Sequence, residues 1–308
     1  MKKFAEWLTA RPSRAFLVGA SVSVLTLVAL PLTAWLPAGV MVLALLAAGR
    51  VTAGAAGLGA ALPIAWGFSQ VFGLGGGLVL AGSVLVPAYL AGNLLERSRS
   101  LSFVFQAVTL VACALVLLVH MLLGDPTGVL MPLVDYVRPA LEETARTLSE
   151  MGVERTPEEI GAATARVAWA TAAWMVLLHT MLAMFLGLWA FGSVREPGLF
   201  GGQFRAMKLG RFVAWLAVAM LGVSLLSQWL TGTAWQPAED VLFVLACAFL
   251  LQALAVVHAL RDAQVIGPAL VVLTYVAVVL LPMAVVGLGF ADSWVRLRER
   301  LPRRPPPA

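Results

Sequence analysis

The chain contains 308 residues, of which 61% are hydrophobic and only 12% are charged, and its mean hydropathy is +0.92. A water-soluble domain of this size and composition would expose far too much apolar surface, so a soluble globular protein is excluded. The formal net charge of +5 does not predict nucleic-acid binding, because the basic residues lie in short clusters at the ends of apolar runs.

These apolar runs predict an all-α fold, a polytopic transmembrane helix bundle that forms a single membrane domain over residues 1–308. The first run, Ala15 to Trp35, follows a basic segment from Met1 to Arg14. This run is too long for the apolar region of a signal peptide, so we expect a retained anchor with a cytoplasmic N-terminus. A shorter run, Ala38 to Gly49, returns the chain to Arg50.

The next run begins at Val51 and places Ala53, Gly57 and Ala61 at four-residue spacing. Lipid provides no hydrophobic force between helices, so small residues at this spacing serve to let two helix backbones approach closely. We expect a packing seam here, against another subunit or against the protein's own bundle, and we favour its own bundle. The glycine-rich stretch from Gly73 to Gly77 predicts a turn before the following apolar run.

A long polar segment follows the predicted span from Leu101 to Leu123. It covers residues 124–160 and is rich in Asp and Glu, which indicates an acidic loop on the outer face of the membrane. Within it, Tyr136 to Met151 has apolar residues between charged ones, and this pattern predicts a helix lying on the surface. Thr156, followed by proline and glutamate, predicts the start of a helix that continues to Gly192.

Residues 193–211 form a basic, glycine-rich loop that we assign to the cytoplasmic face. Phe204, Arg205 and Lys208 of this loop suit either the lipid headgroups or a membrane-protein partner, and the two alternatives look alike in sequence. The chain then crosses the membrane again from Phe212 to Leu230.

The run from Glu239 to Asp262 is a clear membrane span with Gln252 near its middle and His258 near its basic end. A polar side chain in lipid costs free energy unless it faces a partner, so Gln252 should point into the helix bundle. Together with Gln106 and His179, these two residues are the candidate ligand-binding residues.

The last apolar run, Val265 to Phe290, is interrupted by Pro268 and Pro282. If this run crosses the membrane, the chain has nine spans and its arginine-rich tail lies outside. If it re-enters without crossing, the tail is cytoplasmic and the distribution of Lys and Arg obeys the positive-inside rule. We therefore expect eight or nine spans.

Patterns that carry catalysis or bind metals are missing from the sequence. It contains no HExxH and no arrangement typical of an intramembrane protease, and its glycine clusters lack the context of a phosphate-binding loop. His120, His179 and His258 belong to different spans at different predicted depths, which disfavours a shared metal site. No Asp or Glu lies deep in a predicted span, so ion coupling is not indicated. We expect no enzyme, no cofactor, no metal, and packed thiols at Cys113 and Cys247.

Five short stretches carry a family resemblance that covers nearly the whole chain. They are RSRSL at 97–101, HMLLGDP at 120–126, PGLFGGQFRAMKLGR at 197–211, LQALAVVHAL at 251–260 and ADSW at 291–294. In this order they resemble the YybS-like family of predicted bacterial membrane proteins, whose function is unknown. The glycine-rich stretch AAGRVTAGAAGLGAA at 47–61 is distantly similar to the S components of energy-coupling-factor transporters, which implies a small-molecule-binding bundle that docks on a separate ATP-driven module.

These observations lead us to expect a membrane-embedded component that binds or transports a small molecule and has no energy source of its own. The alternative is a non-transporting membrane scaffold or assembly factor, in which the polar residues only tie helices together; a membrane enzyme ranks third. The expected partners are the lipid bilayer, a membrane protein and a small-molecule ligand, without nucleic acid. The expected location is the bacterial inner membrane.

Overall fold

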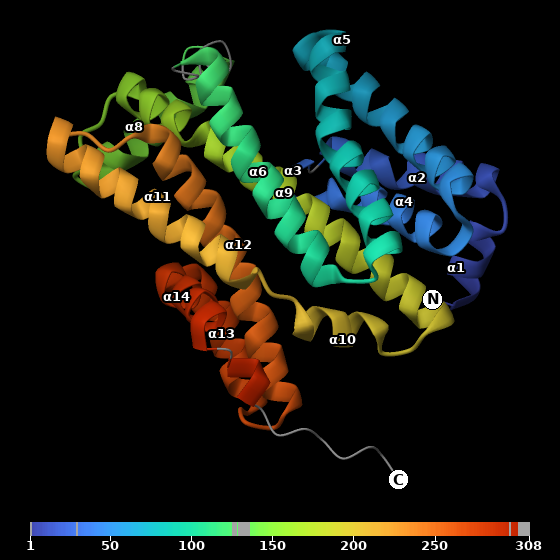
Figure 1. Cartoon of the computed structure of the whole chain (residues 1–308). Coiled ribbons are helices and arrows are strands. Elements are labelled where there is room, and N and C mark those ends of the chain that lie inside the picture. The colour runs from blue at the N-terminus through green and yellow to red at the C-terminus, as the bar shows by residue number, and fades with distance from the viewer. Residues whose placement is uncertain (1, 29, 125–127, 129–135, 296, 301–308) are drawn as a thin grey trace. The chain divides into compact units, whose positions relative to one another are not determined.

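The computed structural model describes residues 2–28, 30–124, 128, 136–295 and 297–300, and every regular element within these ranges is helical (Figure 1). The chain divides into two compact units. Unit 1 comprises residues 1–110, 175–214 and 246–308, and unit 2 comprises residues 111–174 and 215–245. The all-helical prediction is therefore confirmed for the described part of the chain.

The N-terminal region of unit 1 is built from short helices. They are α1 (Lys2–Thr9), α2 (Pro12–Val28), α3 (Leu30–Thr33) and α4 (Trp35–Ala48). The predicted run from Ala15 to Trp35 is therefore described as α2, α3 and the first residue of α4, and residue 29 lies outside the described residues. The 17 residues of α2 rise by about 25 Å and the 14 residues of α4 by about 21 Å, both less than the roughly 30 Å of a bilayer core.

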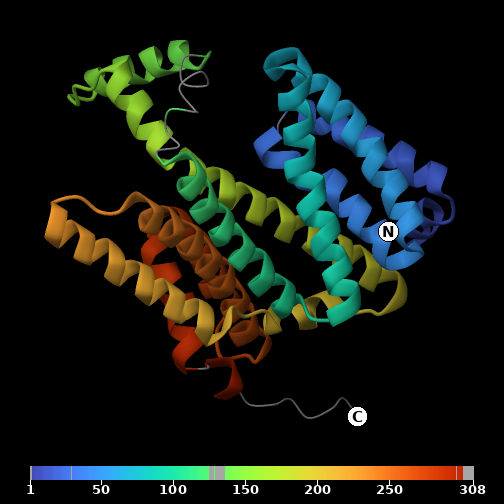
Figure 2. The ribbon, with the colours of Figure 1, turned by 45° about the horizontal axis from the view of Figure 1, so that its top comes forward.

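Helix α5 (Arg50–Ser98) folds back on itself at Gly73, where φ is 69° and ψ is 170°. Glycine adopts this positive φ without the steric penalty that a Cβ brings. The two legs, residues 50–72 and 74–98, lie side by side in both ribbon views (Figure 2). They approach so closely that a Cβ on Gly77 would collide with the carbonyl oxygen of Ala65. The predicted glycine turn is therefore confirmed.

The first leg of α5 packs against α2 through small residues. A Cβ on Gly19 would collide with the carbonyl oxygen of Ala56, and a Cβ on Gly59 would collide with that of Phe16. Two glycines, one on each helix, thus allow backbone contact, as expected for helices that associate by van der Waals packing. This contact lies inside the chain.

Five helices of the described residues are long and apolar enough to cross a membrane. They are α5, α6 (Leu101–Leu123), α9 (Pro157–Arg195), α11 (Gly210–Thr231) and α12 (Gln236–Asp262). A sixth candidate is the pair α13 (Pro268–Leu280) and α14 (Pro282–Val295), which is bent by 117°. The expectation of eight or nine spans is not confirmed, because the first two predicted spans form short helices and the last one is broken at Pro282.

Unit 2 contains the acidic segment, and α9 begins there as the sequence predicts. Thr156 and Glu159 form a capping box: the Thr156 hydroxyl accepts a hydrogen bond from the Glu159 N–H at 3.2 Å, and the Glu159 carboxylate accepts one from the Thr156 N–H at 3.3 Å. Helix α8 (Arg138–Glu150) has no buried residue. Asp125 and Asp135 of the predicted acidic loop lie outside the described residues, as do Arg296, Arg303 and Arg304 of the tail.

A buried histidine–aspartate pair joins α6 and α12 within unit 2. His120 Nε2 is 2.7 Å from Asp240 Oδ2, and the exposed fractions of the two residues are 8% and 3%. The other carboxylate oxygen of Asp240 accepts a hydrogen bond of 2.8 Å from the Gln236 amide. Both oxygens are satisfied by neighbours, which is the condition for burying a carboxylate.

Candidate functional site

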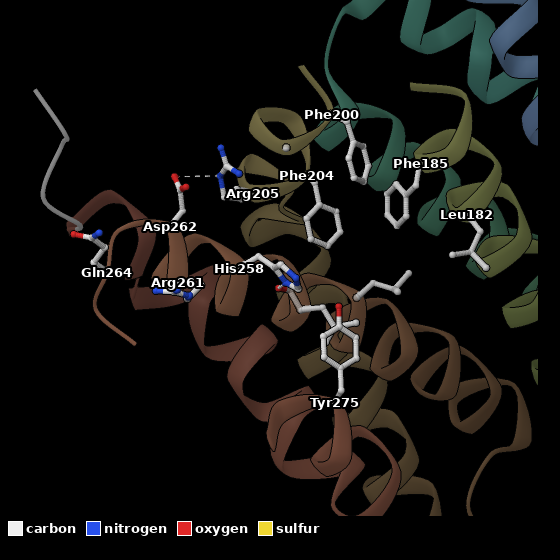
Figure 3. A pocket seen from close by; sticks show the side chains of 13 residues that line it. Leu182, Phe185, Phe200, Phe204, Arg205, His258, Arg261, Asp262, Gln264 and Tyr275 are labelled. Atoms are coloured by element: carbon white, nitrogen blue, oxygen red, sulfur yellow. Dashed lines mark hydrogen bonds and ion pairs between the residues drawn. The ribbon is translucent and has the colours of Figure 1, made fainter. Parts of the chain in front are cut away.

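The candidate site is a pocket of about 720 Å³ within unit 1, bordered by α9, α10 (Leu199–Ala206), α12 and α13. Its volume lies in the usual range for small-molecule sites. We call it the aromatic pocket; the residues that define it in the argument below are Phe185, Phe200, Phe204, His258, Tyr275, Arg205, Arg261 and Asp262. Figure 3 shows these side chains around one hollow.

Three phenylalanines form one wall of the aromatic pocket. Phe185 projects from α9, whereas Phe200 and Phe204 lie one turn apart on α10. The ring centroids are 5.3–5.8 Å apart, with an edge-on contact between Phe185 and Phe204 and a stacked one between Phe200 and Phe204. These are the favoured aromatic geometries, so the wall is fixed in position and presents apolar surface to the hollow.

His258 and Tyr275 place polar atoms beside this apolar wall. His258 lies between Phe204 and Tyr275, with ring centroids 5.4 and 6.0 Å away, and its Nδ1 is 2.9 Å from the Leu254 carbonyl oxygen. A neutral imidazole that donates from Nδ1 keeps Nε2 as an acceptor. The Tyr275 hydroxyl points into the hollow in Figure 3. The pocket can therefore satisfy a ligand hydroxyl or ester group.

Charged side chains stand at one end of the aromatic pocket. Arg205 Nε is 3.4 Å from Asp262 Oδ2, and both side chains remain partly exposed, at 37% and 47%. Arg261 lines the same end and forms no ion pair within the described ranges. Gly201 lies directly beneath the Arg205 guanidinium, since a Cβ there would stand 3.0 Å from Nη1. This end of the pocket is basic.

Three glutamines hold the backbone that carries α10 and the residues after it. Gln203 accepts a hydrogen bond of 3.0 Å from the Leu101 N–H and donates one to the Arg99 carbonyl, while Gln106 donates one of 3.1 Å to the Lys208 carbonyl. The third glutamine, Gln252, accepts a hydrogen bond of 2.7 Å from the Leu209 N–H. The basic loop is therefore fixed to α6 and α12, and α10 has a defined place beside the pocket.

Gln252 also connects α12 to α14 and to the start of the tail. Its amide nitrogen lies 2.9 Å from the Gly289 carbonyl oxygen and 3.1 Å from Asp292 Oδ2. Arg298 then binds Asp292 at 2.6 Å and donates hydrogen bonds to the carbonyl oxygens of Arg205 and Met207 at 2.8 and 2.7 Å. Helix α14, the basic loop and the tail thus converge on one glutamine.

The four candidate ligand-binding residues have different surroundings. Gln252 is fully buried, so its predicted inward orientation is confirmed, but its amide is already hydrogen-bonded to the protein. Gln106 holds the loop, and the buried His179 is not among the residues that line the aromatic pocket. His258 lines it. Ligand binding by His258 stays a prediction with a pocket to support it.

The six candidate partner-contact residues fall into two groups. Ala53 is fully buried and Gly57 faces Met41 of α4, while Ala61 is half-buried, so this part of α5 packs within the chain. In the basic loop, Phe204 and Arg205 line the aromatic pocket and Lys208 is exposed. A partner contact of the loop stays a prediction.

Sequence reasoning missed several residues of the site. Phe185 and Tyr275 are single aromatic residues within apolar runs, and nothing in their local pattern distinguishes them from lipid-facing residues. Asp292 follows the last predicted run, Val265 to Phe290, yet it is only 5% exposed and lies within α14. Asp240, near the start of α12, is likewise buried, so the expectation that no Asp or Glu lies deep in a span stays a prediction. A lone Asp beside Ser293 in an apolar helix was the available signal.

Comparisons with known proteins agree with the membrane character of this fold. No curated protein and no solved structure matches the chain, so neither contributes a fold or an activity. One family does match, over residues 15–293, and its description is "Predicted membrane protein (DUF2232)". Since this match covers most of the 308 residues, the chain belongs to the DUF2232 family of predicted membrane proteins.

Proposed function

We propose that this protein is a membrane-embedded component that binds a small molecule in the aromatic pocket and has neither an enzymatic activity nor an energy source of its own. The observation that carries the proposal is the pocket of about 720 Å³, whose aromatic wall, polar atoms of His258 and Tyr275, and basic end come from four helices. Apolar concave sites with a few convergent polar groups are the usual form of small-molecule sites. The sequence contains neither a phosphate-binding loop motif nor a protease pattern.

The resemblances noted in the sequence extend this proposal. Similarity to the YybS-like family suggests a bacterial inner membrane, and distant similarity to the S components of energy-coupling-factor transporters suggests a transport role with a separate ATP-driven partner. In that case the exposed Lys208 and its neighbours in the basic loop are candidates for the partner contact.

The proposed topology has a cytoplasmic N-terminus and eight crossings. The two legs of α5 count as separate crossings, because each is longer than the roughly 20 residues that a bilayer core requires. Helices α2 and α4 cross where the bilayer thins locally. The pair α13 and α14 re-enters, because its 13 and 14 residues rise by only about 20 Å each before and after the bend.

The second candidate function is a non-transporting membrane scaffold or assembly factor. The glutamine contacts favour a scaffold, because the side chains of Gln252, Gln106 and Gln203 form hydrogen bonds within the protein itself. Those residues tie helices together under either proposal. The aromatic pocket distinguishes the two proposed functions, because a scaffold does not require a pocket.

Native mass spectrometry of the full chain, purified with native lipid, tests the proposal. The wild type should retain a small molecule that Leu254→Trp loses, because an indole at this position fills the aromatic pocket. Leu58→Trp is the matched control: Leu58 is 64% exposed on α5, so this variant should retain the molecule. Identical spectra for all three proteins, with or without bound molecules, would contradict binding in the pocket and favour the scaffold.

A further inference from the structure

The charges around the aromatic pocket restrict the class of ligand. Two guanidinium groups, of Arg205 and Arg261, face one carboxylate, of Asp262. Asp262 is already engaged at 3.4 Å by the Nε atom of Arg205, which leaves the terminal nitrogens of that guanidinium outside this ion pair. Arg261 has no carboxylate partner in the described part of the chain. This end of the pocket therefore carries a net positive charge.

Aromatic walls can also bind cations through their π faces, so a cationic ligand has to be considered. A cationic headgroup in this pocket would lie beside Arg261 and would find the carboxylate of Asp262 occupied. Like charges at close range oppose binding, whereas guanidinium groups form strong, directional hydrogen bonds with phosphate oxygens. The charges at this end of the pocket therefore favour an anionic ligand over a cationic one.

The interior of the aromatic pocket requires an apolar group on the same ligand. Leu182, Leu251 and Leu254 join the three phenylalanines, and the His258 ring and the Tyr275 hydroxyl lie beside this apolar surface. A free phosphate ion would occupy the basic end and leave this apolar surface uncovered. A hydrocarbon chain covers it, and the two polar atoms can meet a hydroxyl or ester near the headgroup.

We infer that the ligand of the aromatic pocket is an anionic amphiphile, a phosphate group carried on an apolar chain. This inference rests on the proposed binding function and specifies its ligand class. The phosphate lies between Arg205 and Arg261, and the chain lies along Phe200, Phe204 and Phe185 toward Tyr275. His258 stands at the junction of the two regions.

Isothermal titration calorimetry of the full chain in nanodiscs of zwitterionic lipid provides the test, with three probes: dodecyl phosphate, dodecanol and inorganic phosphate. Dodecyl phosphate should bind at least tenfold more tightly than either of the others. Arg261→Gln should weaken its binding about tenfold, the value of roughly one charge-assisted hydrogen bond, and leave dodecanol unaffected. Arg50→Gln, a matched change of an arginine at a different, smaller pocket, should leave all three affinities unchanged.

The outcomes separate this inference from the proposed function. Equal affinities for dodecyl phosphate and dodecanol, both lost in Leu254→Trp and unchanged in Arg261→Gln, would overturn the anionic ligand and keep the binding pocket. Tight binding of inorganic phosphate alone would overturn the amphiphile. Binding of no probe, together with no effect of Leu254→Trp on co-purified molecules, would contradict the proposed function itself.

Discussion

Gln252 illustrates how one residue can organise a membrane protein without contacting a ligand. An amide side chain has both a donor and an acceptor, so a single glutamine can satisfy a backbone N–H on one side and a carbonyl or carboxylate on the other. Gln252 does so for Leu209 and for Gly289 with Asp292. Local sequence predicts that such a residue faces inward, but its partners lie 37 to 43 positions away and only the fold identifies them.

Replacing Gln252 with leucine tests this organising role. The variant leaves the buried N–H of Leu209 without its acceptor and removes a donor from Asp292, and each buried group left unsatisfied costs about 1–3 kcal/mol. We expect a clearly lower midpoint of thermal unfolding, measured by tryptophan fluorescence in detergent. Gln70→Leu is the control, because Gln70 is exposed and bonds only within its own helix turn. Equal midpoints for Gln252→Leu and Gln70→Leu would refute the role.

At the level of elements, the sequence predicts helix starts and tight turns well, because these depend on neighbouring residues. The capping box at Thr156 and the turn at Gly73 are examples. Helix α10 was not predicted, because its eight residues are stabilised by Gln203 through contacts about a hundred positions away.

The packing of α2 on α5 gives a prediction at this level. Gly59→Ala puts a Cβ against the carbonyl oxygen of Phe16, a backbone atom that can move away only if the helices separate. Overpacking of this kind costs roughly 1–3 kcal/mol, so the thermal midpoint should fall. The same change at Gly54, five residues earlier, meets no atom within 4 Å and should be neutral or stabilising, since alanine favours helix. If the Gly59→Ala protein were as stable as the Gly54→Ala protein, the close packing of α2 on α5 would be disproved.

For the whole molecule, the main question is on which side of the membrane the C-terminus lies. Arg298 binds the carbonyl oxygens of Arg205 and Met207, and Arg205 pairs with Asp262 at the end of α12. The start of the tail, the basic loop and the beginning of the α13–α14 pair therefore share one side of unit 1. Pro268 and Pro282 left two topologies open in the sequence, because a proline marks a break without giving the direction that follows it.

We predict a cytoplasmic C-terminus from this relation together with the positive-inside rule. Green fluorescent protein fused after Ala308 should fluoresce, and alkaline phosphatase fused at the same position should be inactive, because the first folds only in the cytoplasm and the second only outside it. The engineered cysteine of Gln264→Cys, in a Cys113→Ser/Cys247→Ser background, should resist membrane-impermeant maleimide in intact cells, whereas that of Glu150→Cys should react. An active phosphatase with a protected Gln264→Cys would mean that α13 and α14 cross the bilayer as a kinked span. The Arg298 contacts would then be incompatible with the protein in its membrane.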